Sequence, residues 1–401
     1  NNNNNNNNNI INFIVPPSKS ETNRVLLISM LYYSSITIDN CLICEDTILM
    51  LNALKILGVK HTIITNTNHY FNINIIGCGG DIPIKKCNLY LGNSGTCCRF
   101  LIPVLCLQNG NLEYTILCDE KMKSRPMKDL FICLEKLGCN IEYLEEKYSL
   151  PIVIYKNNCD NNKIYNLSIN SNISSQFITG LLIALSKYKN NYIIDLENNI
   201  VSREFINLTI NILNKFGKDI QFNNNKLFIN NLNNIEIQLN NYSILPDASS
   251  ATYSIIFALL NKCNIFIPNL NNYNSQGDIK YCINIIKQFG GIIIEKDNGI
   301  YVMGAKTDKL KLTGIGTIDM DSSDAFLSIA ALASYCNGIT KIVNIDNQEL
   351  KECERISVIY NILKECNVDI VREHNELTIT GNPINNNSSN SNSNNNNNNI
   401  N

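Results

Sequence analysis

The chain has 401 residues, 44% of them hydrophobic, and this length is typical of two or three domains with buried cores. A net charge of -2 gives no reason to expect nucleic acid or an anionic membrane surface as a partner. No secretory signal is visible and no apolar stretch is long enough to cross a bilayer, so we expect a cytoplasmic protein. The Asn- and Ser-rich residues 1–9 and 385–401 are expected to be tails outside the fold.

The sixteen cysteines, without such a signal, indicate a reducing compartment in which thiols serve as small core residues. Cys41 and Cys44 have the spacing of a redox pair, but no second pair accompanies them and the chain has only three histidines. The glycine patterns of phosphate loops and dinucleotide sites are absent. We therefore expect neither a metal nor a cofactor.

The first predicted junction, Pro16–Arg24, joins an apolar strand to an apolar helix. Its two prolines cannot continue a strand ladder, and Ser18 or Ser20 can cap the helix that follows. Because a helix N-terminus attracts anions, Lys19 and Arg24 are placed to bind one phosphate or carboxylate together with it. The alternative is an ordinary capped helix with two solvated cations.

A unit of helix and strand recurs along the rest of the chain. Amphipathic helices that stop at Gly or Asn are expected at Asp46–Gly58, Lys128–Gly138, Arg203–Gly217, Asp278–Gly290 and Glu354–Asn367. Strands follow at Thr62–Thr65, Cys139–Leu144, Ile292–Glu295 and Val368–Val371, and more apolar helices are expected at Cys97–Leu107, Gln176–Leu185, Ala248–Leu259 and Ala325–Tyr335. The stops lie 73 to 80 residues apart, which predicts repeated modules.

These five modules predict an α/β (α+β) protein of two domains. We expect three modules in a first domain, residues 17–245. Two modules would form a second domain, residues 10–16 and 246–384, whose last module is missing or replaced by the tail. The segment Leu239–Asp247 is expected to carry the crossing between the domains, and the cleft between them is a usual place for a ligand.

The segment Leu89–Phe100 predicts a strand, a turn and a helix start that can bind an anion. Gly95 lets the backbone approach a ligand, Thr96 can cap the helix, and Arg99 follows one turn later. Arg125 stands directly before a proline that begins another helix. Only six of the 33 basic residues are arginine, which favours their use as planar two-pronged donors. The alternative is a tight turn with a structural arginine.

Further polar motifs precede other apolar helices. Ser174–Gln176 caps one helix and offers hydroxyls and an amide, donors suited to a polyhydroxylated substrate. Ser202 belongs to a weaker motif of this kind. Asp247 and Asp324 each stand at the entrance to a helix, where most aspartates are simple caps.

The segment Asn347–Arg355 carries the densest charge. Lys351, Glu352 and Arg355 are expected within one helical turn, so a carboxylate is held beside two cations and can exchange protons with a bound group. A lone charge run of this kind is more often a solvated helix face. Together the motifs predict anionic, polyhydroxylated substrates and acid–base transfer rather than redox chemistry.

The order of these motifs resembles 5-enolpyruvylshikimate-3-phosphate synthase, over about Asn12 to Pro383. The motifs are PPSKSETNR, LGNSGTCCR, MKSRP, SSQF, DASSATY, DAF and KECER. The likeness is closest to the form inside the pentafunctional AROM polypeptides of the shikimate pathway. It implies two domains of βαβαββ modules, an inverse α/β barrel. It also implies transfer of the enolpyruvyl group of phosphoenolpyruvate to the 5-hydroxyl of shikimate 3-phosphate, through a tetrahedral intermediate and with release of phosphate.

The resemblance also implies roles for individual residues. Shikimate 3-phosphate would be bound by Ser20, Arg24, Ser174, Ser175, Gln176, Ser202, Asn347 and Lys351, and phosphoenolpyruvate by Lys19, Gly95, Arg125 and Arg355. Asp324 would take the proton from the 5-hydroxyl, and Glu352 with Lys19 would protonate the enolpyruvyl carbon. Residues behind the site would be Asp46, Asn93, Arg99 and Asp247. Gly95 further implies sensitivity to glyphosate.

Some positions depart from the family's pattern. Pro17 replaces a usual Gly, Phe205 replaces a Tyr, and Asp319–Asp324 is one residue shorter. The final module, with an Asp-His-Arg-Met motif and a closing Lys, has no counterpart after Pro383. Three hypotheses therefore stand. The first is an active enolpyruvyl transferase of the shikimate pathway, with fusion to or association with other shikimate-pathway enzymes left open. The second is an inactive relative that binds shikimate 3-phosphate or acts as a scaffold, and the third, which fits less well, is a UDP-N-acetylglucosamine enolpyruvyl transferase.

Overall fold

The computed structural model describes residues 10–156, 165–188, 190–233, 239–271, 278–304, 311–320, 323–351 and 353–382. The predicted tails at residues 1–9 and 385–401 lie outside the described residues, as does Glu352.

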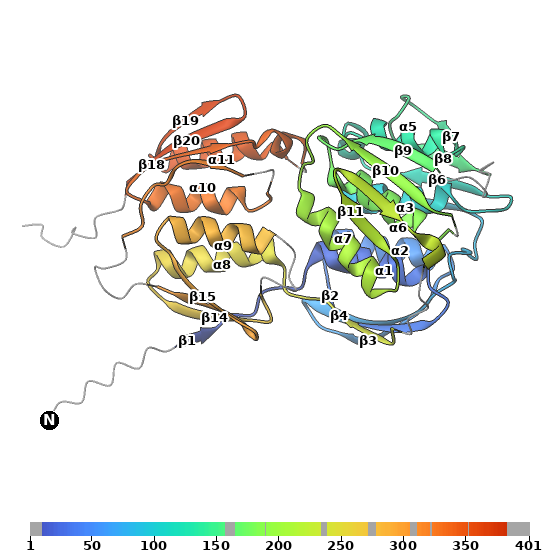
Figure 1. Cartoon of the computed structure of the whole chain (residues 1–401), viewed down its shortest axis with the longest axis horizontal. Coiled ribbons are helices and arrows are strands. Elements are labelled where there is room, and N and C mark those ends of the chain that lie inside the picture. The colour runs from blue at the N-terminus through green and yellow to red at the C-terminus, as the bar shows by residue number, and fades with distance from the viewer. Residues whose placement is uncertain are drawn as a thin grey trace, which may run out of the picture.

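Helices and strands alternate along the chain (Figure 1). The helices are α1 (Lys19–Met30), α2 (Glu45–Ile56), α3 (Gly95–Cys106), α4 (Glu120–Lys123), α5 (Lys128–Lys136), α6 (Ser175–Leu185), α7 (Arg203–Lys215), α8 (Ala248–Leu260), α9 (Asp278–Gln288), α10 (Phe326–Tyr335) and α11 (Arg355–Glu365). The predicted stops are confirmed, because positive φ angles occur just beyond five of these helices, at Gly58, Gly138, Gly217, Gly290 and Asn367. A left-handed residue cannot continue a helix, so each of the five ends two residues before its predicted stop.

The strands described here form five four-stranded sheets with one common pattern. In each sheet the first two strands are parallel and the remaining neighbours are antiparallel. The orders are β1 (Ile10–Asn12), β14 (Asn264–Pro268), β16 (Gly299–Met303), β15 (Ile292–Lys296); β13 (Asn241–Ser243), β2 (Ser35–Leu42), β4 (Tyr70–Ile76), β3 (Lys60–Asn66); β5 (Lys86–Tyr90), β6 (Glu113–Leu117), β8 (Ile152–Tyr155), β7 (Asn140–Tyr143); β9 (Tyr165–Asn170), β10 (Tyr192–Glu197), β12 (Lys226–Ile229), β11 (Ile220–Asn223); and β17 (Gly316–Asp319), β18 (Gly338–Val343), β20 (Glu376–Gly381), β19 (Asp369–Glu373). The predicted repeat is therefore confirmed as a repeat of one sheet topology.

Two of these sheets take their first strand from a distant part of the chain. The N-terminal strand β1 pairs with β14, and β13 pairs with β2. The two passages of chain that this requires lie side by side, because the Ser18 amide donates to Leu245 O and the Asp247 amide donates to Pro16 O, each at 2.8 Å. The second passage coincides with the predicted crossing segment.

The buried apolar residues form two clusters. One extends from Val25 to Ile244, and the other contains Val15 and residues from Ala248 to Ile379. Figure 1 shows α8 to α11 lying between the sheet with β14 and β15 and the sheet with β18 to β20. Helices thus fill the interior and sheets cover it, as the inverse barrel requires. The exact domain limits, 17–245 against 10–16 with 246–384, stay a prediction.

Cysteines contribute to these cores as predicted. Every cysteine that the structure describes is a free thiol, and Cys41, Cys97, Cys98 and Cys133 are among the buried ones. Close helix packing also depends on Gly180 in α6, where an added Cβ would lie 2.0 Å from the Arg99 carbonyl oxygen of α3. The absence of a side chain there lets α3 and α6 meet, and both helices carry pocket residues at their N-terminal ends.

Two capping interpretations do not hold, and one local prediction is wrong. Ser94, not Thr96, caps α3, because Ser94 has the extended backbone of a cap and its hydroxyl accepts from the Cys97 amide at 3.1 Å. Asp324 does not cap α10, since its carboxylate pairs with cations instead. Lys351 and Arg355 do not share a helical turn: Lys351 ends the short 3₁₀ helix η2 (Asp346–Leu350) in an extended conformation, and Arg355 begins α11.

Candidate active site

One pocket is lined by residues from the first part of the chain, Lys19 to Phe205, and from its later part, Asp324 to Arg355. It contains most of the predicted site residues, namely Lys19, Ser20, Arg24, Arg99, Arg125, Ser174, Ser175, Gln176, Ser202, Asp324, Asn347, Lys351 and Arg355. Thr96, Pro126, Ile173 and Phe205 complete its lining. The sequence motifs, which are spread over more than 300 residues, therefore meet at one place.

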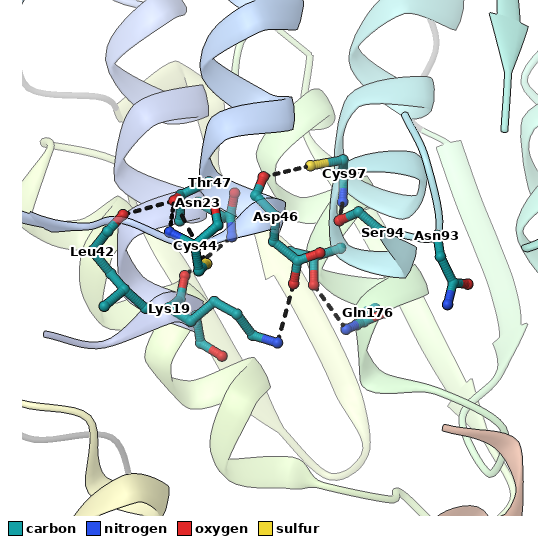
Figure 2. A network of polar contacts seen from close by, with 12 residues as sticks. Lys19, Asn23, Leu42, Cys44, Asp46, Thr47, Asn93, Ser94, Cys97 and Gln176 are labelled. Atoms are coloured by element: carbon teal, nitrogen blue, oxygen red, sulfur yellow. Dashed lines mark hydrogen bonds and ion pairs between the residues drawn. The ribbon is translucent and has the colours of Figure 1, made fainter. Parts of the chain in front are cut away.

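The N-terminus of α1 brings Lys19 into this pocket. Ser18 is the cap, and its hydroxyl accepts from the Glu21 amide at 3.2 Å, as predicted. The Lys19 ammonium forms an ion pair with Asp46 at 3.1 Å, which Figure 2 shows at the start of α2. The Lys19 amide donates to Asp247 Oδ2 at 3.3 Å. Asp46 and Asp247 thus bind Lys19, and neither aspartate lines the pocket.

Arg24 is the most deeply buried cation of the pocket, with 2% of the residue exposed. Its guanidinium carbon lies 4.9 Å from the centre of the Phe100 ring, within cation–π distance. Its Nη1 donates to the Ser20 carbonyl at 2.8 Å, one turn earlier on α1. Desolvation lowers the pKa of Arg24, and the charge of Glu21 opposes that shift.

The start of α3 lies against Arg125. The Arg125 Nη1 donates to the Asn93 carbonyl at 2.8 Å, and a Cβ added to Gly95 would lie 2.7 Å from Arg125 Nη2. The side-chain Oδ1 of Asn93 is buried and has no hydrogen-bond partner among the described residues. Gly95 does not itself line the pocket; its bare backbone gives the guanidinium group room.

Gln176 joins α6 to α3 at the edge of the pocket. Its Oε1 accepts from Arg99 Nη1 at 2.9 Å, and its Nε2 donates to Thr96 Oγ1 at 3.3 Å. Arg99 Nη2 also donates to the Pro126 carbonyl at 2.8 Å. Ser174 caps α6 as predicted, its hydroxyl accepting from the Gln176 amide at 3.3 Å. These contacts orient Gln176 and fix the surrounding lining.

Asp324 and two cations, Lys351 and Arg355, form the wall of the pocket that comes from the later part of the chain. Asp324 Oδ1 lies 3.2 Å from Lys351 Nζ and 2.9 Å from Arg355 Nη1. Burial raises the pKa of Asp324, but Lys351 and Arg355 outweigh it and lower this pKa to about 2. Asp324 is therefore a carboxylate held beside two cations, whereas the carboxylate predicted beside them, Glu352, lies outside the described residues.

Sequence reasoning missed two side chains that hold this wall in place. Gln348 accepts from Arg355 Nη1 at 3.0 Å and donates to the Ser323 carbonyl at 3.3 Å. Arg372 on β19 contacts Ser357 of α11 and donates to Glu349 at 2.9 Å. The scarcity of arginine was a signal for Arg372, although it lies outside the motifs.

The pocket offers cations, hydroxyls and one carboxylate, a set suited to an anionic, hydroxyl-bearing ligand and to proton transfer. Within the described ranges, no group of three or more His, Cys, Asp or Glu residues is arranged to hold a metal ion. None of the helices there is both long and apolar enough to span a membrane.

Comparison with known proteins agrees with this geometry. A family model described as EPSP synthase (3-phosphoshikimate 1-carboxyvinyltransferase) matches residues 8–394. The 3-phosphoshikimate 1-carboxyvinyltransferase of Colwellia psychrerythraea is 32% identical over 366 residues, covering 90% of this chain and 82% of that protein. The protein of the same name from Buchnera aphidicola subsp. Baizongia pistaciae is 34% identical over 369 residues, covering 92% and 82%.

The fold has a solved counterpart as well. A structure of EPSP synthase from Acinetobacter baumannii superposes with a TM-score of 0.76 at 22% identity, covering 92% of this chain and 81% of that one. The match confirms the predicted two-domain enolpyruvyl transferase fold. From the family match and these relatives, the chain belongs to the EPSP synthase (3-phosphoshikimate 1-carboxyvinyltransferase) family.

Proposed function

We propose that this chain transfers the enolpyruvyl group of phosphoenolpyruvate to the 5-hydroxyl of shikimate 3-phosphate and releases phosphate. The family membership and the names of the relatives support this reaction. The observation that connects this reaction to particular residues is the pocket that is lined by Lys19, Arg24, Arg125, Asp324 and Arg355.

The shikimate 3-phosphate site is assigned to the hydroxyl-rich side of the pocket. Arg24 supplies a positive charge there, and Lys351 a second from the opposite wall. Hydroxyls and amides satisfy the remaining polar groups of such a ligand, from Ser20, Ser174, Ser175, Gln176, Ser202 and Asn347. The Ser174 hydroxyl already accepts from the Gln176 amide in the α6 cap, so the orientation of this hydroxyl is set before a ligand binds.

Phosphoenolpyruvate is assigned to the cations around Lys19. Arg125 and Arg355 are planar donors that match the geometry of carboxylate and phosphate groups. Arg125 lies beside Gly95, whose missing side chain leaves room for the guanidinium group at this place. Glyphosate, which takes the phosphoenolpyruvate place in the family, is expected to compete here.

Asp324 is assigned as the base that takes the proton from the 5-hydroxyl. In the unliganded pocket its pKa of about 2 makes it a weak base. Anionic substrates that bind Lys351 and Arg355 share the charge of these cations, and the pKa of Asp324 then rises toward a useful range. Lys19 with Glu352 is assigned to protonation of the enolpyruvyl carbon, although Glu352 lies outside the described residues.

The reaction is tested by phosphate release from the purified chain with both substrates. We expect release that needs both substrates, falls with glyphosate and drops by about a hundredfold or more in Lys19→Ala, since Lys19 is assigned both binding and proton transfer. A surface-lysine variant, Lys226→Ala, which removes only the exposed pair with Asp195, is the matched control. Binding of shikimate 3-phosphate without any turnover would instead favour the inactive relative. Fusion to other pathway enzymes and a cytoplasmic location stay predictions.

A further inference from the structure

We propose that Thr209, together with Thr179, positions Arg24 so that one N–H of its guanidinium group faces an oxyanion of the substrate. Thr209 is then a positioning residue, since it does not line the pocket. The inference rests on the proposed function, because the oxyanion is taken to belong to shikimate 3-phosphate. Neither threonine lies in the motifs that marked the site in the sequence.

Three helices hold the Arg24 guanidinium group. Its Nε donates to Thr209 Oγ1 of α7 at 2.8 Å, and its Nη2 donates to Thr179 Oγ1 of α6 at 3.2 Å and to the Phe205 carbonyl at 3.3 Å. Its Nη1 donates to the Ser20 carbonyl of α1 at 2.8 Å. Arginine has five N–H donors, so these four bonds leave one, on Nη1, for a ligand in the pocket that Arg24 lines.

The two hydroxyl groups have one proton arrangement that satisfies every contact. Thr209 Oγ1 donates to the Phe205 carbonyl at 2.9 Å and accepts from Arg24, and it lies 3.0 Å from Thr179 Oγ1. Because Thr209 has used its single proton, Thr179 must donate to Thr209 and accept from Arg24 Nη2. Both threonines are completely buried, so water does not compete for these bonds. The guanidinium plane is therefore fixed by oriented acceptors behind it.

These acceptors are neutral, and this leaves the charge of Arg24 available to a ligand. Arg24 forms no ion pair within the part of the chain that the structure describes. The nearby Glu21 carboxylate accepts instead from the Tyr242 hydroxyl at 2.6 Å and from the Leu245 amide at 3.0 Å. A buried cation held by hydroxyls attracts an anion more strongly than one already neutralised by a carboxylate.

The test compares Thr209→Val, which keeps the shape but removes the hydroxyl, with Thr209→Ser, which keeps the hydroxyl. Calorimetric binding of shikimate 3-phosphate, without turnover, is the main readout. We expect Thr209→Val to bind about tenfold more weakly, as for a lost hydrogen bond to a charged group, and Thr209→Ser to stay within about twofold of the wild type. In turnover assays the KM for shikimate 3-phosphate should rise while the KM for phosphoenolpyruvate changes by less than about twofold.

Thr252→Val is the matched control. Thr252 is equally buried and its hydroxyl accepts from Ser328 at 2.8 Å, but it lies on α8 and does not line the pocket. A merely structural role for Thr209 would lower the melting temperature of both valine variants and leave both affinities unchanged, and that result overturns the inference.

The other outcomes are also decisive. If the wild type does not bind shikimate 3-phosphate, the proposed function fails and this inference fails with it. If the wild type binds but Thr209→Val binds equally well, only the inference fails. If Thr209→Val does not fold, Thr179→Val decides in its place: about threefold weaker binding supports the positioning role, and unchanged binding rejects it.

Discussion

At Gly95 the absence of a single carbon atom sets how close Arg125 can lie to the start of α3. An added Cβ would meet the Arg125 guanidinium carbon at 2.9 Å and Nη2 at 2.7 Å. Arg125 is buried and its Nη1 is bound to the Asn93 carbonyl, so the guanidinium group has little freedom to move away. This position should therefore affect the side of the pocket assigned to phosphoenolpyruvate more directly than the side assigned to shikimate 3-phosphate.

We expect Gly95→Ala to raise the KM for phosphoenolpyruvate and the inhibition constant of glyphosate by about tenfold or more, because the displaced Arg125 loses a charge-assisted bond to both. The affinity for shikimate 3-phosphate should change by less than about twofold. Steady-state kinetics with each substrate varied in turn measure the difference. Gly110→Ala serves as control for backbone strain away from the pocket, since Gly110 has a positive φ of 97° but no atom lies within 4 Å of the added Cβ. An unchanged KM for phosphoenolpyruvate would count against the assigned place of Arg125.

Among the elements, η2 is held by side chains from other parts of the chain. It carries Asn347 to the pocket and leads into Lys351. Arg372 of β19 binds Glu349 within η2 at 2.9 Å and Glu354, just before α11, at 3.1 Å. A residue on a sheet thus holds a short helix that has few backbone bonds of its own.

Replacing Arg372 should loosen the pocket wall that contains Asn347, Lys351 and Arg355, although Arg372 itself does not line the pocket. We expect Arg372→Gln to lower kcat/KM by about tenfold through Asn347, Lys351 and Arg355, while the unfolding free energy falls by only about 1 kcal/mol, as for a partly exposed ion pair. Lys341→Gln, which breaks the ion pair with Glu376 in the same sheet, is the control and should keep full activity. Equal losses of activity in the two variants would show that Arg372 acts only through stability.

For the molecule as a whole, Asp324 links the loop before α10 to Lys351 and to Arg355 at the start of α11. Its folded-state pKa of about 2 is below the ordinary value of 3.8. A carboxyl group with a depressed pKa stabilises the folded state fully above its unfolded pKa and loses that contribution as the pH falls through its folded pKa. The shift corresponds to roughly 2 kcal/mol of unfolding free energy.

The wild type should therefore be more stable than Asp324→Asn by a constant amount from about pH 7 to about pH 5, and the difference should shrink as the pH falls below the ordinary value of 3.8. Urea unfolding of both proteins across this range measures it. An Asp46→Asn variant, which removes the ion pair with Lys19 in the first part of the chain, provides the comparison. A difference that stays constant down to about pH 3 would show that Asp324 is not held ionised by its cations.

The repeat, the helix stops and most of the pocket residues could be predicted from local patterns in the sequence. Periodic apolar residues and Gly or Asn stops are local signals, so α5 and α7 could be predicted from their own residues. Short motifs likewise marked Lys19, Arg125 and Gln176, because a helix cap with a nearby cation is a local chemical pattern.

Which of these local signals act together depends on how the chain folds. Asp324 had the pattern of a cap, but cations from another segment bind its carboxylate, and a long-range ion pair leaves no local trace. Thr179 and Thr209 are ordinary helix residues in the sequence and become oriented acceptors only because α6 and α7 meet behind Arg24. The pairing of β1 with β14 is equally non-local, since sheet partners far apart in the chain are chosen by packing and not by neighbouring residues.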